Sequence, residues 1–264
     1  MKCGFTGLDC ECMSLCTEGC REWEHFNEQY PNKEQKMEQK KVVVLGHDSY
    51  ISPYRTYLRS KGFKTFISAS YNHHLEKTLE VVGGTPALIL FTGGQDINPG
   101  LYKEKYKHIF FNQLRDDWEE EWFNFAVKHK VPMLGTCRGM QMFTILTGGK
   151  LLRHVDHHTE DHEIYTPELL MVNSLHHQMC LPYPGTYKLL AWAHKQATQF
   201  DPPHHLSRLP LYDKTPVEPE ALYFPEVKAL GFQWHPEMMP LDSPAHKFVI
   251  KCLDTHLNLG EEEQ

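Results

Sequence analysis

The chain contains 264 residues, of which 41% are hydrophobic, and its formal net charge is −7 at pH 7. This length and hydrophobic content suffice for the core of a globular domain, whereas the acidic balance argues against a nucleic-acid partner, which would need clustered Lys and Arg. Because we find no run of about 18 apolar residues and no apolar secretion signal at the start, we expect no membrane partner and a cytoplasmic location.

The first forty residues differ in composition from the rest of the chain. Five of the eight cysteines lie there, namely Cys3, Cys10, Cys12, Cys16 and Cys20. Their spacing lacks the Cys-x2-Cys pairs of common zinc modules, and the residues that follow are mostly polar. We therefore predict a Cys-rich, flexible extension over residues 1–40, with zinc binding as the alternative. Met37, just before the first apolar run, is a candidate for the true start.

From residue 41 onwards, short apolar runs alternate with helical patterns, which is typical of a parallel sheet covered on both faces. The first half is predicted to contain strands at 41–45, 65–68, 87–91 and 131–134. Its predicted helices cover residues 54–61, 73–82, 115–130 and 138–146. The fold class predicted is α/β, with three layers and a mostly parallel central sheet between helices, as in flavodoxin-like folds.

The second half has shorter strand patterns and proline-rich connections, which favour a mixed edge of the sheet. The expected strands cover residues 169–172, 187–192, 222–224 and 228–233. A closing helix is expected at 244–257, because Pro244 suits the first helical turn. We predict one domain over residues 41–258, followed by an acidic tail at 259–264.

Cys137 stands where an apolar run breaks at Gly135 and a helical pattern begins. A strand-to-helix turn of this kind exposes a side chain at the carboxyl end of a sheet, and the amides of the following helix stabilise a thiolate and the oxyanion it creates. The pattern predicts a nucleophilic cysteine, although a structural cysteine at such a junction is the alternative.

A later apolar run leads into His235, with Glu237 two positions beyond it. A thiol nucleophile needs such a pair, because the imidazole moves the proton and the carboxylate fixes its tautomer and orientation. The alternative for His235 is an ordinary loop histidine beside a proline. Together, Cys137, His235 and Glu237 predict a Cys-His-Glu triad.

Four ordered motifs resemble those of one known family. They are FTGGQDINPGLY at 91–102, GTCRGMQ at 135–141 with TGGKL at 147–151, NSLHHQ at 173–178, and GFQWHPE at 231–237. In order and spacing they are similar to the class I glutamine amidotransferase-like hydrolases, in particular the gamma-glutamyl hydrolase branch. The resemblance covers roughly residues 41 to 256 and implies a chemistry that uses no metal and no organic cofactor.

The glycine loop and the helix start are candidates for an oxyanion hole. The amides of Gly93 and Gly94 follow a strand, and the amide of Arg138 opens the helix after the nucleophile. An ordinary tight turn is the alternative for the two glycines, and the resemblance favours the oxyanion role. We expect Asp96 to support this loop, and Arg115 and Asp116 to begin a helix without a catalytic role.

The resemblance also implies three substrate-binding residues. Gln141 would contact the bound gamma-glutamyl group, and Ser174 and His177 would hold its alpha-amino and alpha-carboxylate groups. A helix glutamine is otherwise usually solvated.

The other histidines carry weaker signals. His176 beside His177 raises the question of a metal, but we see no acidic or cysteine partner at ligand spacing and predict none. His154, His157, His158 and His162 are expected in a loop near the active-site mouth, where they either shape substrate entry or are solvated.

These observations predict a hydrolase that cleaves a small gamma-glutamyl amide through a thioester. Arginine follows the nucleophile, where synthetase-linked amidotransferases usually have leucine, and this favours the free-standing branch. The alternatives are a glutaminase subunit that delivers ammonia to a separate synthetase partner, and a binding or redox module built on the N-terminal cysteines. The sequence does not identify the amine leaving group, and a homo-oligomer stays open.

Overall fold

The computed structural model describes residues 40–46, 51–68, 75–106, 109–155, 158–194, 200–201 and 217–258. The predicted cysteine-rich extension, Met37, His157 and the acidic tail lie outside the described residues, and the domain boundaries therefore stay predictions. Within the described ranges, we find no helix with the length and apolar character needed to cross a membrane.

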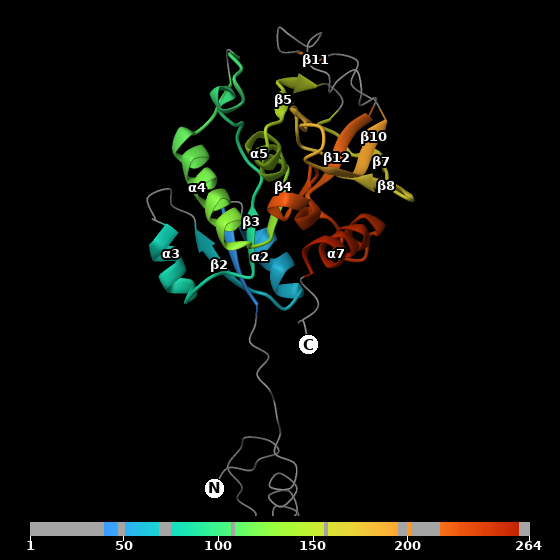
Figure 1. Cartoon of the computed structure of the whole chain (residues 1–264). Coiled ribbons are helices and arrows are strands. Elements are labelled where there is room, and N and C mark those ends of the chain that lie inside the picture. The colour runs from blue at the N-terminus through green and yellow to red at the C-terminus, as the bar shows by residue number, and fades with distance from the viewer. Residues whose placement is uncertain are drawn as a thin grey trace, which may run out of the picture. The chain divides into compact units, whose positions relative to one another are not determined.

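A nine-stranded sheet with the order β2-β1-β3-β4-β13-β12-β10-β7-β8 organises the described part of the chain (Figure 1). Its strands are β1 (Lys41–Leu45), β2 (Lys64–Ser68), β3 (Leu88–Phe91), β4 (Met133–Thr136), β7 (His162–Tyr165), β8 (Leu169–Val172), β10 (Lys188–His194), β12 (Val217–Phe224) and β13 (Ala229–Phe232). The pairings from β2 to β13 are parallel, and those from β13 to β8 are antiparallel. The sheet is therefore mixed, with its antiparallel part built by the second half of the chain.

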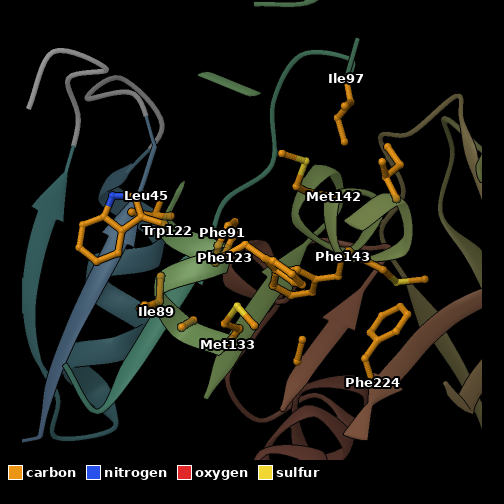
Figure 2. Packing of buried hydrophobic residues seen from close by; sticks show 14 of the residues in the cluster. Leu45, Ile89, Phe91, Ile97, Trp122, Phe123, Met133, Met142, Phe143 and Phe224 are labelled. Carbon is orange, nitrogen blue, oxygen red and sulfur yellow. The ribbon is translucent and has the colours of Figure 1, made fainter. Parts of the chain in front are cut away.

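Helices cover both faces of this sheet because alternate residues of the central strands point to opposite sides. Val42 and Val44 of β1 pack with α2 (Ile51–Ser60) and α7 (Pro244–Leu257). Val43 and Leu45 pack with α3 (Leu75–Val82), α4 (Gln113–His129) and α5 (Arg138–Leu146). Figure 2 shows this second cluster, with Trp122, Phe123 and Phe143 among its aromatic members.

Capping residues explain where two of these helices begin. Asn112 precedes α4, and its side chain accepts hydrogen bonds from the amides of Leu114 and Arg115, at 3.1 and 3.3 Å. Ser243 precedes α7 and accepts from the amide of His246 at 3.2 Å, with Pro244 as the first helical residue.

The predicted fold class is confirmed, and the elements of the first half agree with the prediction to within a few residues. Short strands of the second half were missed, namely β5 (Lys150–Leu152), β6 (His154–Val155), β7, β9 (Met179–Leu181) and β11 (Phe200–Asp201). The prediction that His154 and His162 lie in a loop was wrong, because His154 begins β6, and His158, although outside any strand or helix, is not solvated. His162 begins β7, and the side chains of His158 and His162 are buried.

Helix α5 sits directly on the backbone of β3. An added Cβ at Gly139 would lie 2.3 Å from the carbonyl oxygen of Phe91, and one at Gly135 would lie 2.6 Å from the carbonyl carbon of Gly139. Only glycine allows this approach, which fixes the position of the turn between β4 and α5.

We predict that Gly139→Ala lowers the free energy of unfolding by about 1–3 kcal/mol, because the backbone of β3 must move away from α5. Urea denaturation measures this change. The matched control is Gly100→Ala, since a Cβ there meets the end of the Asn98 side chain at 3.2 Å. Equal stability of the two variants would contradict the close packing.

Candidate active site

Cys137 occupies the sharp turn between β4 and α5. Its backbone has φ 49° and ψ −105°, an unfavourable conformation for a residue with a Cβ, and its side chain is 7% exposed. The amide of Cys137 donates to the carbonyl oxygen of Phe232 in β13 at 2.7 Å. The structure therefore holds the cysteine in a strained elbow, as the sequence predicts, and ties it to the neighbouring strand.

His235 and Glu237 follow β13 and face this elbow. Nδ1 of His235 lies 2.6 Å from Oε1 of Glu237, and the His235 ring and the Cys137 side chain both lie against Gly93. Burial alone would lower the pKa of His235, but the hydrogen bonds with Cys137 and Glu237 outweigh it and raise the pKa to about 10. The three predicted triad residues are thus connected in the order cysteine, histidine, glutamate.

Asn173 holds the backbone of His235 on both sides. Its Nδ2 donates to the carbonyl oxygen of His235 at 3.0 Å, and its Oδ1 accepts from the His235 amide at 2.9 Å. The sequence placed Asn173 in a motif without giving it a role. The structure shows that it joins the loop at 173–178 to the histidine.

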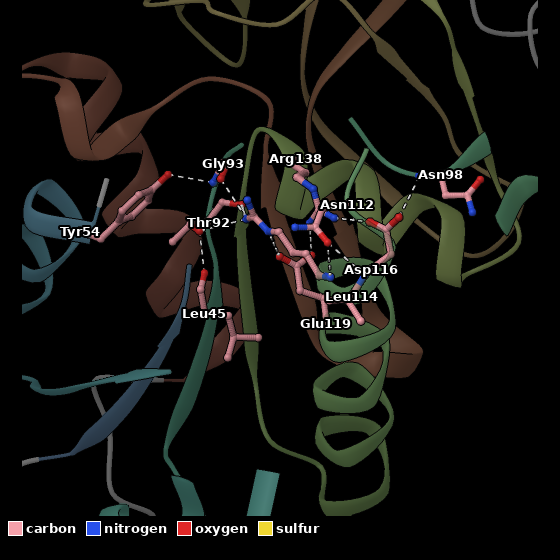
Figure 3. A network of polar contacts seen from close by, with 11 residues as sticks. Leu45, Tyr54, Thr92, Gly93, Asn98, Asn112, Leu114, Asp116, Glu119 and Arg138 are labelled. Atoms are coloured by element: carbon pink, nitrogen blue, oxygen red, sulfur yellow. Dashed lines mark hydrogen bonds and ion pairs between the residues drawn. The ribbon is translucent and has the colours of Figure 1, made fainter. Parts of the chain in front are cut away.

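The glycine loop contributes one candidate oxyanion donor rather than two. The amide of Gly93 donates to Oη of Tyr54 at 3.0 Å (Figure 3), so it is occupied. Oη of Tyr54 in turn lies 2.8 Å from Oγ1 of Thr136. Gly94 has φ +150°, and within the described ranges its amide has no acceptor. The amide of Arg138 is the first of α5 and has no acceptor inside the helix. The amides available for an oxyanion are therefore those of Gly94 and Arg138.

Buried charges link α4 to this loop and to the elbow (Figure 3). The guanidinium of Arg138 is buried and forms ion pairs with Asp116 and Glu119. Arg115 pairs with Glu119 at 2.8 Å and donates to the carbonyl oxygen of Gly93 at 3.0 Å. We call Arg115, Asp116, Glu119 and Arg138 the charge cluster. Arg115 and Asp116 are thus more than the start of a helix, because they hold the residues around the nucleophile.

Burial has opposite effects on the two kinds of charge in this cluster. Desolvation raises the pKa of Asp116 and lowers the pKa of Arg138, while the attraction between the two residues opposes both shifts. Each member therefore depends on its partner to stay ionised in the interior.

A cavity of about 290 Å³ opens beside Cys137. Its walls come from residues 94–96 and 175–178, together with Phe110 and Gln141. Nε2 of His177 lies 2.9 Å from Oδ1 of Asp96, and this hydrogen bond raises the pKa of His177. The predicted residues Gln141 and His177 thus lie in one cavity with the cysteine. Asp96 joins them as a partner of His177.

Ser174 does not line this cavity. Its side chain is buried, and its hydroxyl donates to the carbonyl oxygen of His158. In this arrangement the hydroxyl stabilises the loop at 173–178 and is not available to a ligand, which differs from the predicted substrate contact.

Comparisons with known proteins give named relatives. NtpR of Enterococcus hirae is 30% identical over 177 residues, which are 57% of this chain and 66% of that protein, just under two thirds of its length. The gamma-glutamyl-CDP-amidate hydrolase of Campylobacter jejuni is 25% identical over 154 residues, covering 54% of this chain and 68% of the relative.

A solved structure shares the fold. It is a Thermoplasma acidophilum protein provisionally described as one of the subunits of GMP synthase, with a TM-score of 0.56 and 14% identity, and the match covers 83% of this chain and 94% of that chain. At this identity the likeness concerns the fold alone. The model of the Peptidase C26 family matches residues 31–169, more than half of the chain. We conclude that this chain belongs to the Peptidase C26 family, which is class I glutamine amidotransferase-like.

Proposed function

We propose that the protein is a cysteine hydrolase that cleaves the gamma-glutamyl amide bond of a small compound and releases glutamate and an amine. The observation that carries this proposal is the position of Cys137 in the wall of the cavity, with the hydrogen-bonded pair His235 and Glu237 beside it. Among the described residues, Cys180 and Cys252 are unsuited to this role, because burial raises the pKa of each thiol to about 12.

The reaction follows from the geometry in two steps. The Cys137 thiolate attacks the gamma-carbonyl carbon, and the resulting oxyanion accepts hydrogen bonds from the amides of Gly94 and Arg138. His235 gives a proton to the leaving amine, and a gamma-glutamyl thioester remains on the sulfur. A water molecule, deprotonated by His235, then attacks the thioester carbonyl, and glutamate leaves as the thiolate is restored.

The cavity wall supplies charges that complement the amino-acid end of a gamma-glutamyl group. Asp96 offers a carboxylate to an alpha-ammonium group, and His177, whose pKa is raised by Asp96, offers positive charge near an alpha-carboxylate. Gln141 adds an amide on the same side as the nucleophile. The name of the Campylobacter jejuni relative supports a gamma-glutamyl substrate.

The amine half of the substrate faces the outer part of the cavity. Phe110 and Leu175, which are 83% and 60% exposed, are the apolar side chains of its wall. A panel of substrates should therefore compare apolar, cationic and nucleotide-linked amines on one gamma-glutamyl group.

We predict that the purified protein releases glutamate from at least one gamma-glutamyl amide of such a panel, and that Cys137→Ala lowers the rate by more than about 1000-fold. Glutamate release is measured enzymatically, and circular dichroism confirms that the variant is folded. Cys252→Ala is the matched control and should retain the activity.

Free glutamine belongs in the same panel. Slow turnover of glutamine alone, increased by a synthetase partner, would favour an amidotransferase subunit over the proposed hydrolase. Wild-type activity in Cys137→Ala would contradict the assignment of the nucleophile.

We expect the charge cluster to support catalysis by holding the proposed oxyanion donors in place. Arg115 holds the carbonyl oxygen of Gly93, next to the proposed oxyanion donor Gly94, and Glu119 holds both Arg115 and Arg138. Neutralising Glu119 would leave two buried guanidinium groups with one carboxylate, Asp116.

We predict that Glu119→Gln lowers the free energy of unfolding by about 3 kcal/mol. We also predict that it lowers kcat by about 10- to 100-fold, with a smaller change in KM, at a temperature where the variant stays folded. Urea denaturation and steady-state kinetics test both effects. Glu121→Gln, an exposed substitution on the same helix, is the control. An unchanged kcat would show that the cluster supports the fold without positioning the oxyanion donors.

A further inference from the structure

A second group of polar side chains is buried behind the cavity wall. It consists of His158, His162, His176, Glu218 and Glu220, each at most 5% exposed, and we call it the histidine cluster. Its members come from distant segments of the chain: His162 begins β7, His176 lies in the loop at 173–178, and the two glutamates lie on β12. The triad and the proposed mechanism do not use them.

Three ring nitrogens of this cluster converge on one carboxylate. Oε1 of Glu220 lies 3.8 Å from Nδ1 of His158, 3.3 Å from Nε2 of His162 and 3.7 Å from Nε2 of His176. Within the described part of the chain, none of these nitrogens has a hydrogen-bond partner, and neither does Oε2 of Glu220. Buried polar atoms without partners are costly, which indicates that a ligand belongs between them.

The second nitrogen of each ring, which points away from Glu220 and is called the outer nitrogen, lies within hydrogen-bond distance of an oxygen. Nε2 of His158 lies 2.7 Å from Oε2 of Glu218, Nδ1 of His162 lies 3.2 Å from the carbonyl oxygen of Glu160, and Nδ1 of His176 lies 2.9 Å from that of Gln178. Carbonyl and carboxylate oxygens accept hydrogen bonds, so the proton of each neutral ring is placed on its outer nitrogen. The inner nitrogens then present lone pairs to Glu220, and a cation at the centre would satisfy them together with the carboxylate.

We infer that the histidine cluster binds one divalent transition-metal ion, with Zn²⁺ as the first candidate. His158, His176 and Glu220 supply ligand atoms that all lie within 4.8 Å of one another, and Nε2 of His162, 3.3 Å from Oε1 of Glu220, is a candidate for the fourth. Tetrahedral zinc with bonds of about 2.0–2.1 Å needs ligand atoms about 3.3–3.4 Å apart. The three distances to Glu220 are close to this value, and side-chain rotation would have to bring the histidine nitrogens around one ion.

The outer hydrogen bonds are those of a metal-bound histidine, whose second ring nitrogen donates to a carboxylate or a carbonyl oxygen. The sequence-based expectation of no metal rested on the lack of an acidic partner at ligand spacing. Glu220 is that partner, and it is brought to the histidines by the pairing of β12 with β10 and of β10 with β7.

The proposed metal ion would have a structural role. It would join β7 and β12 to the loop at 173–178, which holds the His235 backbone through Asn173 and lines the cavity through His177. The ion would therefore fix the wall of the cavity without taking part in the proposed thioester chemistry.

The test measures metal in the full chain, purified without an affinity tag and without chelator. Elemental analysis gives the zinc content as isolated and after addition of one equivalent of Zn²⁺, and X-ray absorption at the zinc edge gives the ligands. His176→Asn removes a ligand, and Glu163→Gln, an exposed substitution on β7, is the matched control. A further variant replaces Cys3, Cys10, Cys12, Cys16 and Cys20 by serine, because these cysteines are an alternative zinc site.

We expect one zinc per chain, kept in Glu163→Gln and in the serine variant and lost in His176→Asn. The absorption spectrum should show nitrogen and oxygen neighbours at about 2.0–2.1 Å and no sulfur at about 2.3 Å. Absence of bound zinc in the wild type after zinc addition, or zinc coordinated by sulfur, would overturn the proposal. If His176→Asn fails to fold, the wild-type spectrum alone decides between these outcomes. Because the readout is metal content, it is independent of hydrolase activity.

Discussion

The strained turn at Cys137 is the constraint on which the rest of the site depends. A cysteine at φ 49° is stable only where its surroundings hold it, and here the close contact of Gly139 with Phe91 fixes the helix that follows. The hydrogen bond from the Cys137 amide to Phe232 fixes the strand beside it. Because β13 leads directly to His235, the same contact that orders Cys137 also fixes the position of His235 relative to it.

Two buried polar groups then hold the walls of the cavity. The charge cluster connects α4 with the glycine loop and the elbow, on the side of the proposed oxyanion donors. The loop at 173–178 forms the opposite side, where Asn173 holds the His235 backbone and His176 enters the histidine cluster. Both groups lie in the interior, where an unpaired charge is costly, and so each favours one arrangement of the cavity.

The sequence predicted what depends on local patterns. The alternating first half, the start of α7 at Pro244 and the motifs around Cys137 and His235 are each readable within a few residues, and the structure agrees with them. The features that the sequence did not predict depend on contacts between segments that are distant in the chain. The Tyr54 hydroxyl accepts a hydrogen bond from the Gly93 amide, which is 39 residues away in the sequence. Glu220 lies near His176 only because the strands pair. The shorter strands of the second half carry too few residues to show a clear period.

The site residues follow the same division. Gln141 and His177 lie in the cavity with Cys137, whereas Ser174 turns its hydroxyl to a backbone carbonyl that no sequence pattern marks. The match to the Peptidase C26 model shows the family, and the cavity supports the proposed choice of a gamma-glutamyl acyl group.

The central claim is that Cys137 carries the acyl group, and the most direct test is mass spectrometry of the protein quenched in acid during turnover of the best gamma-glutamyl substrate. The account predicts a gamma-glutamyl adduct on the peptide that contains Cys137, which disappears as the substrate is consumed. Steady glutamate release with no adduct on this peptide, or an adduct on another cysteine such as Cys180, would contradict it.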